Sequence, residues 1–233
     1  MREAVCAIIG VGPGNGEAYA RRFSDQGHAV ALLSRSVDKL QTLASELPDA
    51  QAFACDASDP DSVRSALGDV ARAMGPVQTL IYNAGAGAFG SIDDVDLSDF
   101  ERAWRVNTLG LAAAAKAVVP AMREAGAGNL IVTGATASRK GGANFAAFAQ
   151  AKAAQRSLAQ SLARKLGPDG IHVALIIIDA VVDLPRTREA MADKATHEFA
   201  KPGAIADAAW FLANQDRSAW TFELDVRPFS ESW

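Results

Sequence analysis

The sequence predicts an α/β protein built on a doubly wound parallel sheet of about seven strands, with helices on both faces. Short apolar runs alternate with longer amphipathic runs along the chain, which is typical of repeated strand–helix units. The run Val173–Ile178 is apolar at every position, as a strand buried on both faces requires. A chain of 233 residues with 49% hydrophobic residues is large enough for one core, so we expect a single domain over residues 1–233.

Each expected strand is a short apolar run bounded by glycine, proline or polar residues. These runs are Val5–Gly10, Ala29–Ser34, Gln51–Cys55, Gln78–Tyr82, Leu130–Thr133, Ile171–Ile178 and Thr221–Val226. The helices expected between them are longer and amphipathic. They are Gly14–Gln26, Val37–Glu46, Asp59–Gly75, Ser98–Arg123, Ala143–Leu166 and Ala204–Asn214. The charged segment near residues 180–203 has no clear period, and we expect a mobile loop region there.

The composition argues against several classes of function. The net charge is -4 with no basic face to offset it, which disfavours nucleic acid and anionic membranes as partners. No segment reaches the roughly 18 apolar residues that a membrane-spanning helix needs. The amino terminus lacks the shape of a signal peptide, so we expect a cytoplasmic protein. Neither the 3 histidines nor the 2 cysteines show metal-ligand spacing, and we expect no metal site.

A glycine-rich loop between the first expected strand and the first expected helix is the strongest local signal. Gly10 permits a tight turn at the strand end, while Gly14, Asn15 and Gly16 open the helix. Small residues here let backbone N–H groups approach a diphosphate at the helix N-terminus. The alternative is a glycine-rich turn without a ligand.

The end of the second expected strand indicates which dinucleotide would bind. Ser34 and Arg35 lie where an adenosine ribose would sit, and residues 29–36 contain no Asp or Glu. An acidic residue there would bond both ribose hydroxyls and favour NAD, whereas a guanidinium pairs with a 2′-phosphate. We therefore expect NADP(H) rather than NAD(H). The alternative for Arg35 is a solvated loop arginine.

Together these motifs resemble the short-chain dehydrogenase/reductase family over essentially the whole chain. Besides the glycine loop, Asp56 matches the residue that contacts adenine, and Asn83-Ala84-Gly85 matches the loop after the fourth strand. Asn107 and Lys152 match two active-site residues of that family. The resemblance implies a Rossmann-like fold and a nicotinamide cofactor. The cofactor-binding residues that the sequence and the resemblance indicate are Gly10, Gly14, Asn15, Gly16, Ser34, Arg35, Asp56, Ala57, Asn83, Ala84, Gly85, Lys152 and Asp179.

The resemblance breaks at the residues that would carry the chemistry. In the family a tyrosine four residues before the lysine donates a proton, and a serine bonds the same substrate oxygen. Here Phe148 holds the tyrosine position and Ala135 the serine position. Acid–base catalysis of this kind is typically worth roughly 10²–10⁴-fold. A shift of one residue would place Thr136 at the serine position, so Asn107, Lys152 and Thr136 are the candidate catalytic residues.

Other hydroxyl groups are weaker candidates. Thr133 or Ser138 would have to turn toward the site, and Tyr19 and Tyr82 are poorly placed in the expected order of elements. Asp179 stands where the family commonly has Pro-Gly and would bring negative charge near the nicotinamide. The alternative for it is a turn aspartate.

Three functions fit these observations. The first is an NADP(H)-binding oxidoreductase with an atypical site, acting on a small molecule in an apolar pocket near Ala135, Phe148 and a substrate-loop region at 180–203. The second is a catalytically inactive NADP(H)-binding sensor or scaffold subunit. The third is an assembly module without cofactor. The family resemblance also implies a homodimer or homotetramer, with Phe229 and Trp233 as candidate interface anchors.

Overall fold

A fully parallel sheet lies at the centre of the molecule. The computed structural model describes residues 4–231. The strands of the sheet are β1 (Val5–Ile9), β2 (Ala29–Ser34), β3 (Ala50–Ala54), β4 (Val77–Tyr82), β5 (Gly128–Thr133), β6 (Ile171–Ile178) and β9 (Glu223–Val226). Their order is β3-β2-β1-β4-β5-β6-β9. The chain therefore winds outward from β1 to β3 and then returns to β4, which confirms the predicted doubly wound, Rossmann-like sheet.

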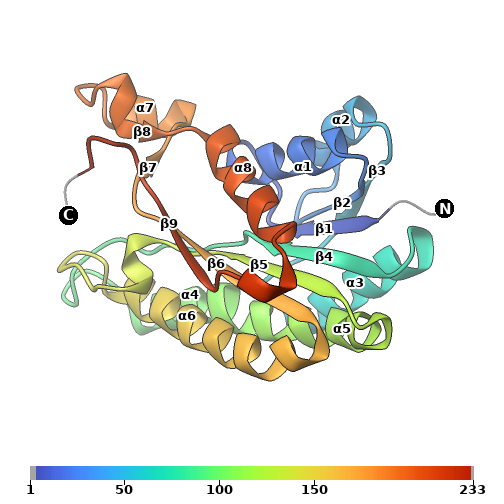
Figure 1. Ribbon diagram of the computed structural model, residues 1–233. Coiled ribbons are helices and arrows are strands. Elements are labelled where there is room, and N and C mark those ends of the chain that lie inside the picture. The colour runs from blue at the N-terminus through green and yellow to red at the C-terminus, as the bar shows by residue number, and fades with distance from the viewer. Residues whose placement is uncertain (1–3, 232–233) are drawn as a thin grey trace.

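Helices cover both faces of this sheet, as Figure 1 shows. One layer consists of α1 (Asn15–Asp25), α2 (Asp38–Glu46) and α8 (Pro202–Ala213). The opposite layer consists of α3 (Pro60–Ala73), α4 (Leu97–Trp104), α5 (Gly110–Ala125) and α6 (Ala146–Leu166). Each layer buries its apolar side against one face of the sheet.

Two apolar cores lie between the sheet and the helices. Because successive side chains of a strand point to opposite faces, Ile8 and Leu32 join the core beneath α1 and α8. Ile9 and Leu33 join the other core, against α3 and α5. Every residue of Ile171–Ile178 is buried, as its uninterrupted apolar sequence predicts.

The helix predicted at Ser98–Arg123 is divided into two. A π-helical turn, Arg105–Leu109, separates α4 from α5. Such a turn inserts a residue into the helical hydrogen-bond pattern and is frequent at functional sites. The apolar period continues through it, which is why the sequence predicts one unbroken helix.

The segment predicted as a mobile loop contains regular structure. It includes α7 (Pro185–Ala190) and two short parallel strands, β7 (Val181–Val182) and β8 (Phe199–Ala200). Arg188 holds the segment together, because its Nε donates to Asp183 Oδ1 at 2.6 Å and its guanidinium lies 4.3 Å from the centroid of the Phe199 ring. These contacts join residues too far apart for a local period to reveal them.

The described residues include no helix that is both long enough and apolar enough to span a membrane. Cys6 and Cys55 are both buried and both free thiols.

Substitution of Gly110 tests how closely α5 packs on the sheet. A Cβ added to Gly110 would overlap the carbonyl oxygen of Ala57 and the hydroxyl of Tyr82. We expect Gly110→Ala to lower the free energy of unfolding by about 1–3 kcal/mol, because the crowded backbone must move. Gly68→Ala in α3 is the matched control, since its added Cβ would meet only Arg72 Nη1 at 3.7 Å.

The control should raise the free energy of unfolding by up to about 1 kcal/mol through helix propensity. Urea unfolding of both variants measures these changes. Equal stabilities would mean that α5 is free to shift away from the sheet.

Candidate active site

The candidate site lies where the carboxyl ends of β1, β4, β5 and β6 meet. In doubly wound sheets the crevice beyond these ends, where the strand order reverses, is the usual ligand site. Three cavities adjoin here, of about 470, 320 and 530 Å³. Gly10 and Asn83 line both of the larger two, and Ser34 and Arg35 line both the 470 Å³ and the 320 Å³ cavities.

The glycine loop after β1 is packed backbone to backbone against the loop after β4. Gly10 has φ 95°, and a Cβ added there would lie 2.5 Å from Ala84 N. A Cβ on Gly16 would lie 2.7 Å from Gly10 O. The side chain of Asn83 donates from Nδ2 to the same carbonyl at 2.9 Å. No side chain larger than hydrogen fits at Gly10 or Gly16 without displacing this arrangement.

The start of α1 presents unbonded N–H groups to the crevice. The first backbone bonds of the helix are donated by Glu17 and Ala18. Among the described residues, no acceptor meets the N–H groups of Asn15 and Gly16, both of which line the 530 Å³ cavity. Asn15 Oδ1 is also buried without a partner in this part of the chain. A helix N-terminus of this kind attracts an anion, phosphate above all.

The cavity of about 470 Å³ brings together most of the residues predicted at the adenosine end. The backbone N–H and the hydroxyl of Ser58 donate to Asp56 Oδ1 at 2.9 and 2.7 Å, and lower the pKa of that carboxyl. The nearby charge of Arg35 lowers the same pKa further. The predicted residues that line this cavity are Gly10, Ser34, Arg35, Asp56, Ala57, Asn83, Ala84 and Gly85.

Polar and cationic side chains line the neighbouring 320 Å³ cavity, between the glycine loop and α2. Ser34, Arg35, Ser36 and Lys39 face this space together. Sequence reasoning identified the first two and missed Ser36 and Lys39. Lys39 could have been found from the sequence. It is a basic residue in the first turn of the second helix, and that turn lies on the same side of the molecule as the end of β2.

The third cavity, of about 530 Å³, contains the predicted catalytic region. Ala135, Phe148 and Lys152 line it together with the start of α1 and with residues 180–182. Leu184 lies over the glycine loop, where a Cβ on Gly14 would overlap its side chain. The predicted substrate-loop region therefore forms one wall of this cavity.

Lys152 is the most unusual group in the cavity. Its side chain is only 5% exposed, and Nζ donates to Thr133 O at 2.8 Å and to Gln155 Oε1 at 3.0 Å. Both acceptors are neutral. Desolvation by burial lowers the pKa of Lys152 to about 7, because no carboxylate compensates for the lost hydration.

Gln155 connects Lys152 to the π-helical turn. Its Nε2 donates to Asn107 O at 2.8 Å, while its Oε1 accepts from Lys152. The Asn107 side chain donates to Ala86 O and Ala103 O, and its Oδ1 is buried with no partner among the described residues. Sequence reasoning found Asn107 and Lys152 but missed Gln155, which carries no motif of its own.

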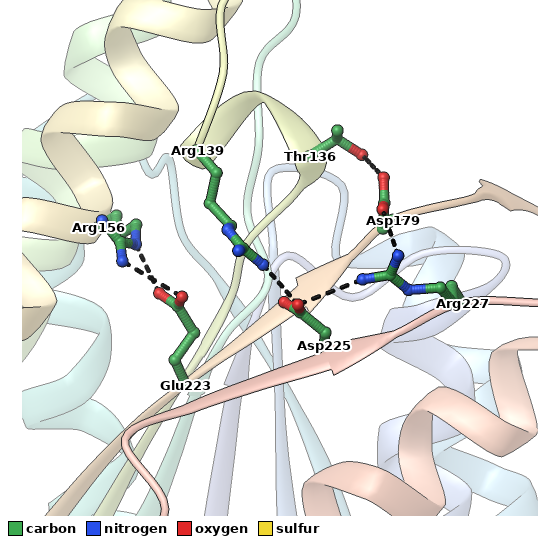
Figure 2. A network of polar contacts seen from close by, with 7 residues as sticks. All are labelled: Thr136, Arg139, Arg156, Asp179, Glu223, Asp225 and Arg227. Atoms are coloured by element: carbon green, nitrogen blue, oxygen red, sulfur yellow. Dashed lines mark hydrogen bonds and ion pairs between the residues drawn. The ribbon is translucent and has the colours of Figure 1, made fainter. Parts of the chain in front are cut away.

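The structure does not bring Thr136 to Phe148 and Lys152. Its Oγ1 donates to Asp179 Oδ1 at 2.5 Å, as Figure 2 shows, and Thr136 is not among the residues that line the 530 Å³ cavity. Asp179 is paired with Arg227 on its other side, at 3.4 Å. The serine-like role of Thr136 and the cofactor contact of Asp179 stay predictions, and in this structure the two side chains bond each other.

The same network fastens β9 to the site. Asp225 accepts from Arg139 at 2.5 Å and from Arg227 at 3.2 Å (Figure 2). Arg156 of α6 forms a two-point ion pair with Glu223, at 2.5 and 3.2 Å. The negative charge that the sequence places near the crevice is thus neutralised by arginines.

The other hydroxyl candidates are also engaged. Tyr19 Oη lies 3.2 Å from Thr133 Oγ1, and burial raises the pKa of Tyr19 to about 12. Tyr82 donates to Val106 O, and burial raises its pKa as well. Ser138 Oγ accepts from Ala135 N. Tyr19, Tyr82 and Ser138 do not line the 530 Å³ cavity, whereas Thr133 does.

Three phenylalanines form an aromatic wall at the mouth of the cavity. The ring of Phe89 lies 5.6 Å from that of Phe145 and 5.7 Å from that of Phe148. Phe89 is 69% exposed, and it lines the cavity with Phe148. Sequence reasoning missed Phe89 because it belongs to a loop with no period. The tail residue Phe229 stacks on His197, and Trp233 lies outside the described residues.

Comparison with known proteins now places the chain in a family. A family model described as short chain dehydrogenase matches residues 4–194, which include the glycine loop, Asn107 and Lys152. The chain belongs to the short-chain dehydrogenase/reductase family. The resemblance found in the sequence is thereby confirmed.

Solved and curated relatives of this short-chain dehydrogenase/reductase agree with that assignment. A short-chain dehydrogenase from Rhodopseudomonas palustris is 34% identical with a TM-score of 0.85, over 98% of this chain and 100% of that chain. A metagenomic short-chain oxidoreductase in complex with NADP is 27% identical with a TM-score of 0.84, over 97% of each chain. The 2-dehydro-3-deoxy-L-rhamnonate dehydrogenase (NAD(+)) of a Sphingomonas species is 32% identical, over 77% of this chain and 73% of the relative.

The burial of Lys152 predicts a pH-dependent stability. Its pKa is about 7 in the folded short-chain dehydrogenase/reductase and about 10.5 in the unfolded chain. Between these values the unfolded chain binds more protons than the folded chain, so this lysine makes the free energy of unfolding rise with pH. Lys152→Met should remove that part of the rise, and Lys165→Met, at an exposed position of the same helix, should keep it.

Urea unfolding at several pH values between 7 and 10.5 measures how steeply the free energy of unfolding rises with pH in each of the two variants. Identical pH dependence in both would show that Lys152 titrates as an exposed lysine does.

Proposed function

We propose that this protein is an NADP(H)-binding oxidoreductase of the short-chain dehydrogenase/reductase type, acting on a small apolar molecule through an atypical active site. One observation carries the proposal. Three adjoining cavities run along the crevice. They begin at the cluster of Ser34, Arg35, Ser36 and Lys39, continue along the glycine loop, and end at Lys152. Their order and chemistry fit a 2′-phosphorylated dinucleotide.

The residues present fit the cofactor at three points. The N–H groups of Asn15 and Gly16 would hold the diphosphate, because they face the crevice without acceptors among the described residues. Asp56 and Ala57 would contact adenine, with Asn83, Ala84 and Gly85 beneath it. Lys152 would lie at the nicotinamide end, in the cavity that it lines with the glycine loop. Asp179 has no part in this assignment, since Thr136 and Arg227 hold it.

The phosphate-binding cluster supports NADP(H) over NAD(H). Arg35 and Lys39 bring two positive charges to the 320 Å³ cavity, and two serine hydroxyls accompany them. The carboxylate on its described lining, Glu17, is paired with Arg21. Guanidinium and ammonium groups with hydroxyl donors are the usual partners of a phosphate. Relatives of both kinds exist, one in complex with NADP and one described as acting with NAD(+), so the proposed preference rests on the chain's own residues.

The atypical part of the site is the acid–base group. Phe148 would stand for the family's tyrosine and Ala135 for its serine, and both line the cavity beside Lys152. When bound, NADPH supplies a hydride, and the site's own residues must bind the acceptor and manage its proton. The aromatic wall of Phe89, Phe145 and Phe148 gives the mouth of the cavity an apolar surface, which favours an apolar acceptor.

The lost hydroxyls favour a second candidate function. A catalytically inactive NADP(H)-binding sensor or scaffold subunit would keep the cofactor cavities and have no need of a proton donor. In both functions a homodimer or homotetramer and a cytoplasmic location stay predictions.

Calorimetric titration with NADPH and with NADH tests the cofactor proposal. We expect tighter binding of NADPH, and Arg35→Ala should weaken NADPH binding roughly 10–100-fold because a charge-assisted hydrogen bond is lost. NADH binding should change little. Arg64→Ala, at an exposed ion pair of α3, is the control and should leave both affinities unchanged. Equal affinities for the two nucleotides in the unmodified protein would contradict the NADP(H) assignment.

Restoring the two missing hydroxyls tests the atypical site. The double variant Phe148→Tyr, Ala135→Ser should raise the rate of carbonyl reduction by about 10²-fold or more over the unmodified protein, since it supplies an acid. A panel of apolar aldehydes and ketones with NADPH measures this. Phe145→Tyr, at the outer end of the same aromatic wall, should have no such effect. A double variant that binds NADPH yet reduces nothing would favour the sensor or scaffold function.

A further inference from the structure

We propose that Lys152 is itself the proton donor and acceptor of this active site, and that Gln155 is the positioning residue that holds its amino group for that role. The proposal rests on the oxidoreductase function proposed above. It assigns to the lysine a step that the absent tyrosine cannot perform.

The lining of the 530 Å³ cavity leaves few sources of a proton. Its described titratable side chains are Lys152 and Arg186, and a guanidinium keeps its proton at every accessible pH. The hydroxyl of Thr133 lies against Tyr19, and that of Thr187 bonds the carbonyl oxygens of Val182 and Leu184. Only the lysine can release a proton to the cavity near neutral pH.

The geometry around Nζ leaves one N–H group for a ligand. An ammonium has three donors, and the described acceptors Thr133 O and Gln155 Oε1 take two of them. A Cβ added to Gly85 would lie only 4.0 Å from Nζ, so the wall beside the amine is bare backbone. The Phe148 ring centroid lies 5.9 Å from Nζ on another side. Lys152 also lines the 530 Å³ cavity, so we assign the remaining donor to a ligand in that cavity.

The surroundings of Lys152 favour loss of its proton. Every element packed around Lys152 presents a neutral group to it. These groups are the Thr133 carbonyl of β5, Gln155 and Phe148 of α6, Asn107 of the π-helical turn and Gly85 of the loop after β4. Tyr19 of α1 reaches this region only through Thr133, and burial keeps its hydroxyl protonated. The nearby carboxylate of Asp179 is paired with Arg227. Burial then lowers the pKa of the lysine toward neutrality, which suits a general acid.

Gln155 fixes the amine without adding charge. Its fully buried amide accepts from Nζ and donates to Asn107 O, so neither group can rotate independently. A glutamate in its place could still accept from Nζ, but it would lose the donation to Asn107 O, and its charge would stabilise the ammonium and keep the proton on it. The neutral amide therefore allows both protonation states of the lysine.

The proton transfer balances in both directions. In reduction, the substrate's carbonyl carbon takes the hydride that NADPH supplies, and its oxygen takes the proton from Nζ. With NADPH bound, a C–H and an O–H bond would form on the substrate. The carbonyl π bond, one N–H bond of Lys152 and the nicotinamide C–H bond that supplies the hydride would break, leaving the nicotinamide oxidised. The neutral amine then takes a proton from water. In oxidation the amine accepts the proton of the alcohol.

Lysine side-chain NMR of the cofactor-free protein tests the proposal without relying on turnover. With 13C-labelled lysine, the Lys152 resonance is assigned by its absence in Lys152→Met and followed from about pH 5 to about pH 11. We expect a midpoint near 7. Gln155→Glu should move it upward by more than one pH unit, whereas Gln160→Glu, further along the same helix, should not move it. Circular dichroism checks that the variants fold.

Activity adds a second readout. With any carbonyl substrate that the NADPH screen yields, Lys152→Met should lower kcat about 10²-fold or more at neutral pH, and Gln155→Glu should shift the pH profile upward with the NMR midpoint. A Lys152 midpoint near 10, or an unshifted one in Gln155→Glu, would overturn the proposal while the cofactor assignment stood. Failure to bind either nucleotide would instead overturn the proposed function, whatever midpoint the resonance shows.

Discussion

The bare backbone contact between Gly10 and Ala84 is the constraint on which the site depends. It brings the end of β1 so close to the loop after β4 that a single Cβ would separate them. Asn83 then bonds the Gly10 carbonyl, and Gly16 packs on the same oxygen. The start of α1 and the loop that faces Lys152 are thus held in one rigid arrangement. The 470 Å³ and 530 Å³ cavities meet at this contact, since Gly10 and Asn83 line both of them.

The two ends of the crevice differ in charge, because the described charged side chains are paired with one another at one end and not at the other. At the outer end Arg35 and Lys39 face open space, where a phosphate would compensate them. At the inner end Asp179, Asp225 and Arg227 compensate one another and tie β9 to the sheet. Lys152 lies between these ends with neutral partners only, so burial controls its protonation.

The sequence was sufficient for elements that depend on local pattern. Alternating apolar runs located all seven strands of the sheet, and the glycine loop located the crevice. The features it missed depend on contacts between distant segments. Gln155 matters because it meets Asn107, 48 positions away, and Arg227 because it pairs with Asp179. Phe89 lies in a loop without any period. Thr136 was placed by counting along the chain, and only the structure shows that its hydroxyl turns to Asp179.

The substitution at position 148 changes what the neighbouring lysine can do. A tyrosine beside Lys152 would give the ammonium a polar neighbour and would itself carry the exchangeable proton. Phe148 presents a ring at 5.9 Å instead, which shields Nζ from water and offers only a weak cation–π attraction. In the atypical site proposed above, a phenylalanine at this position would remove a proton donor and at the same time lower the cost of deprotonating the amine. An anionic dinucleotide in the adjoining cavities would act in the opposite direction and stabilise the ammonium. The proposed cofactor binding and the proposed proton release would in this way be electrostatically coupled through a single buried side chain.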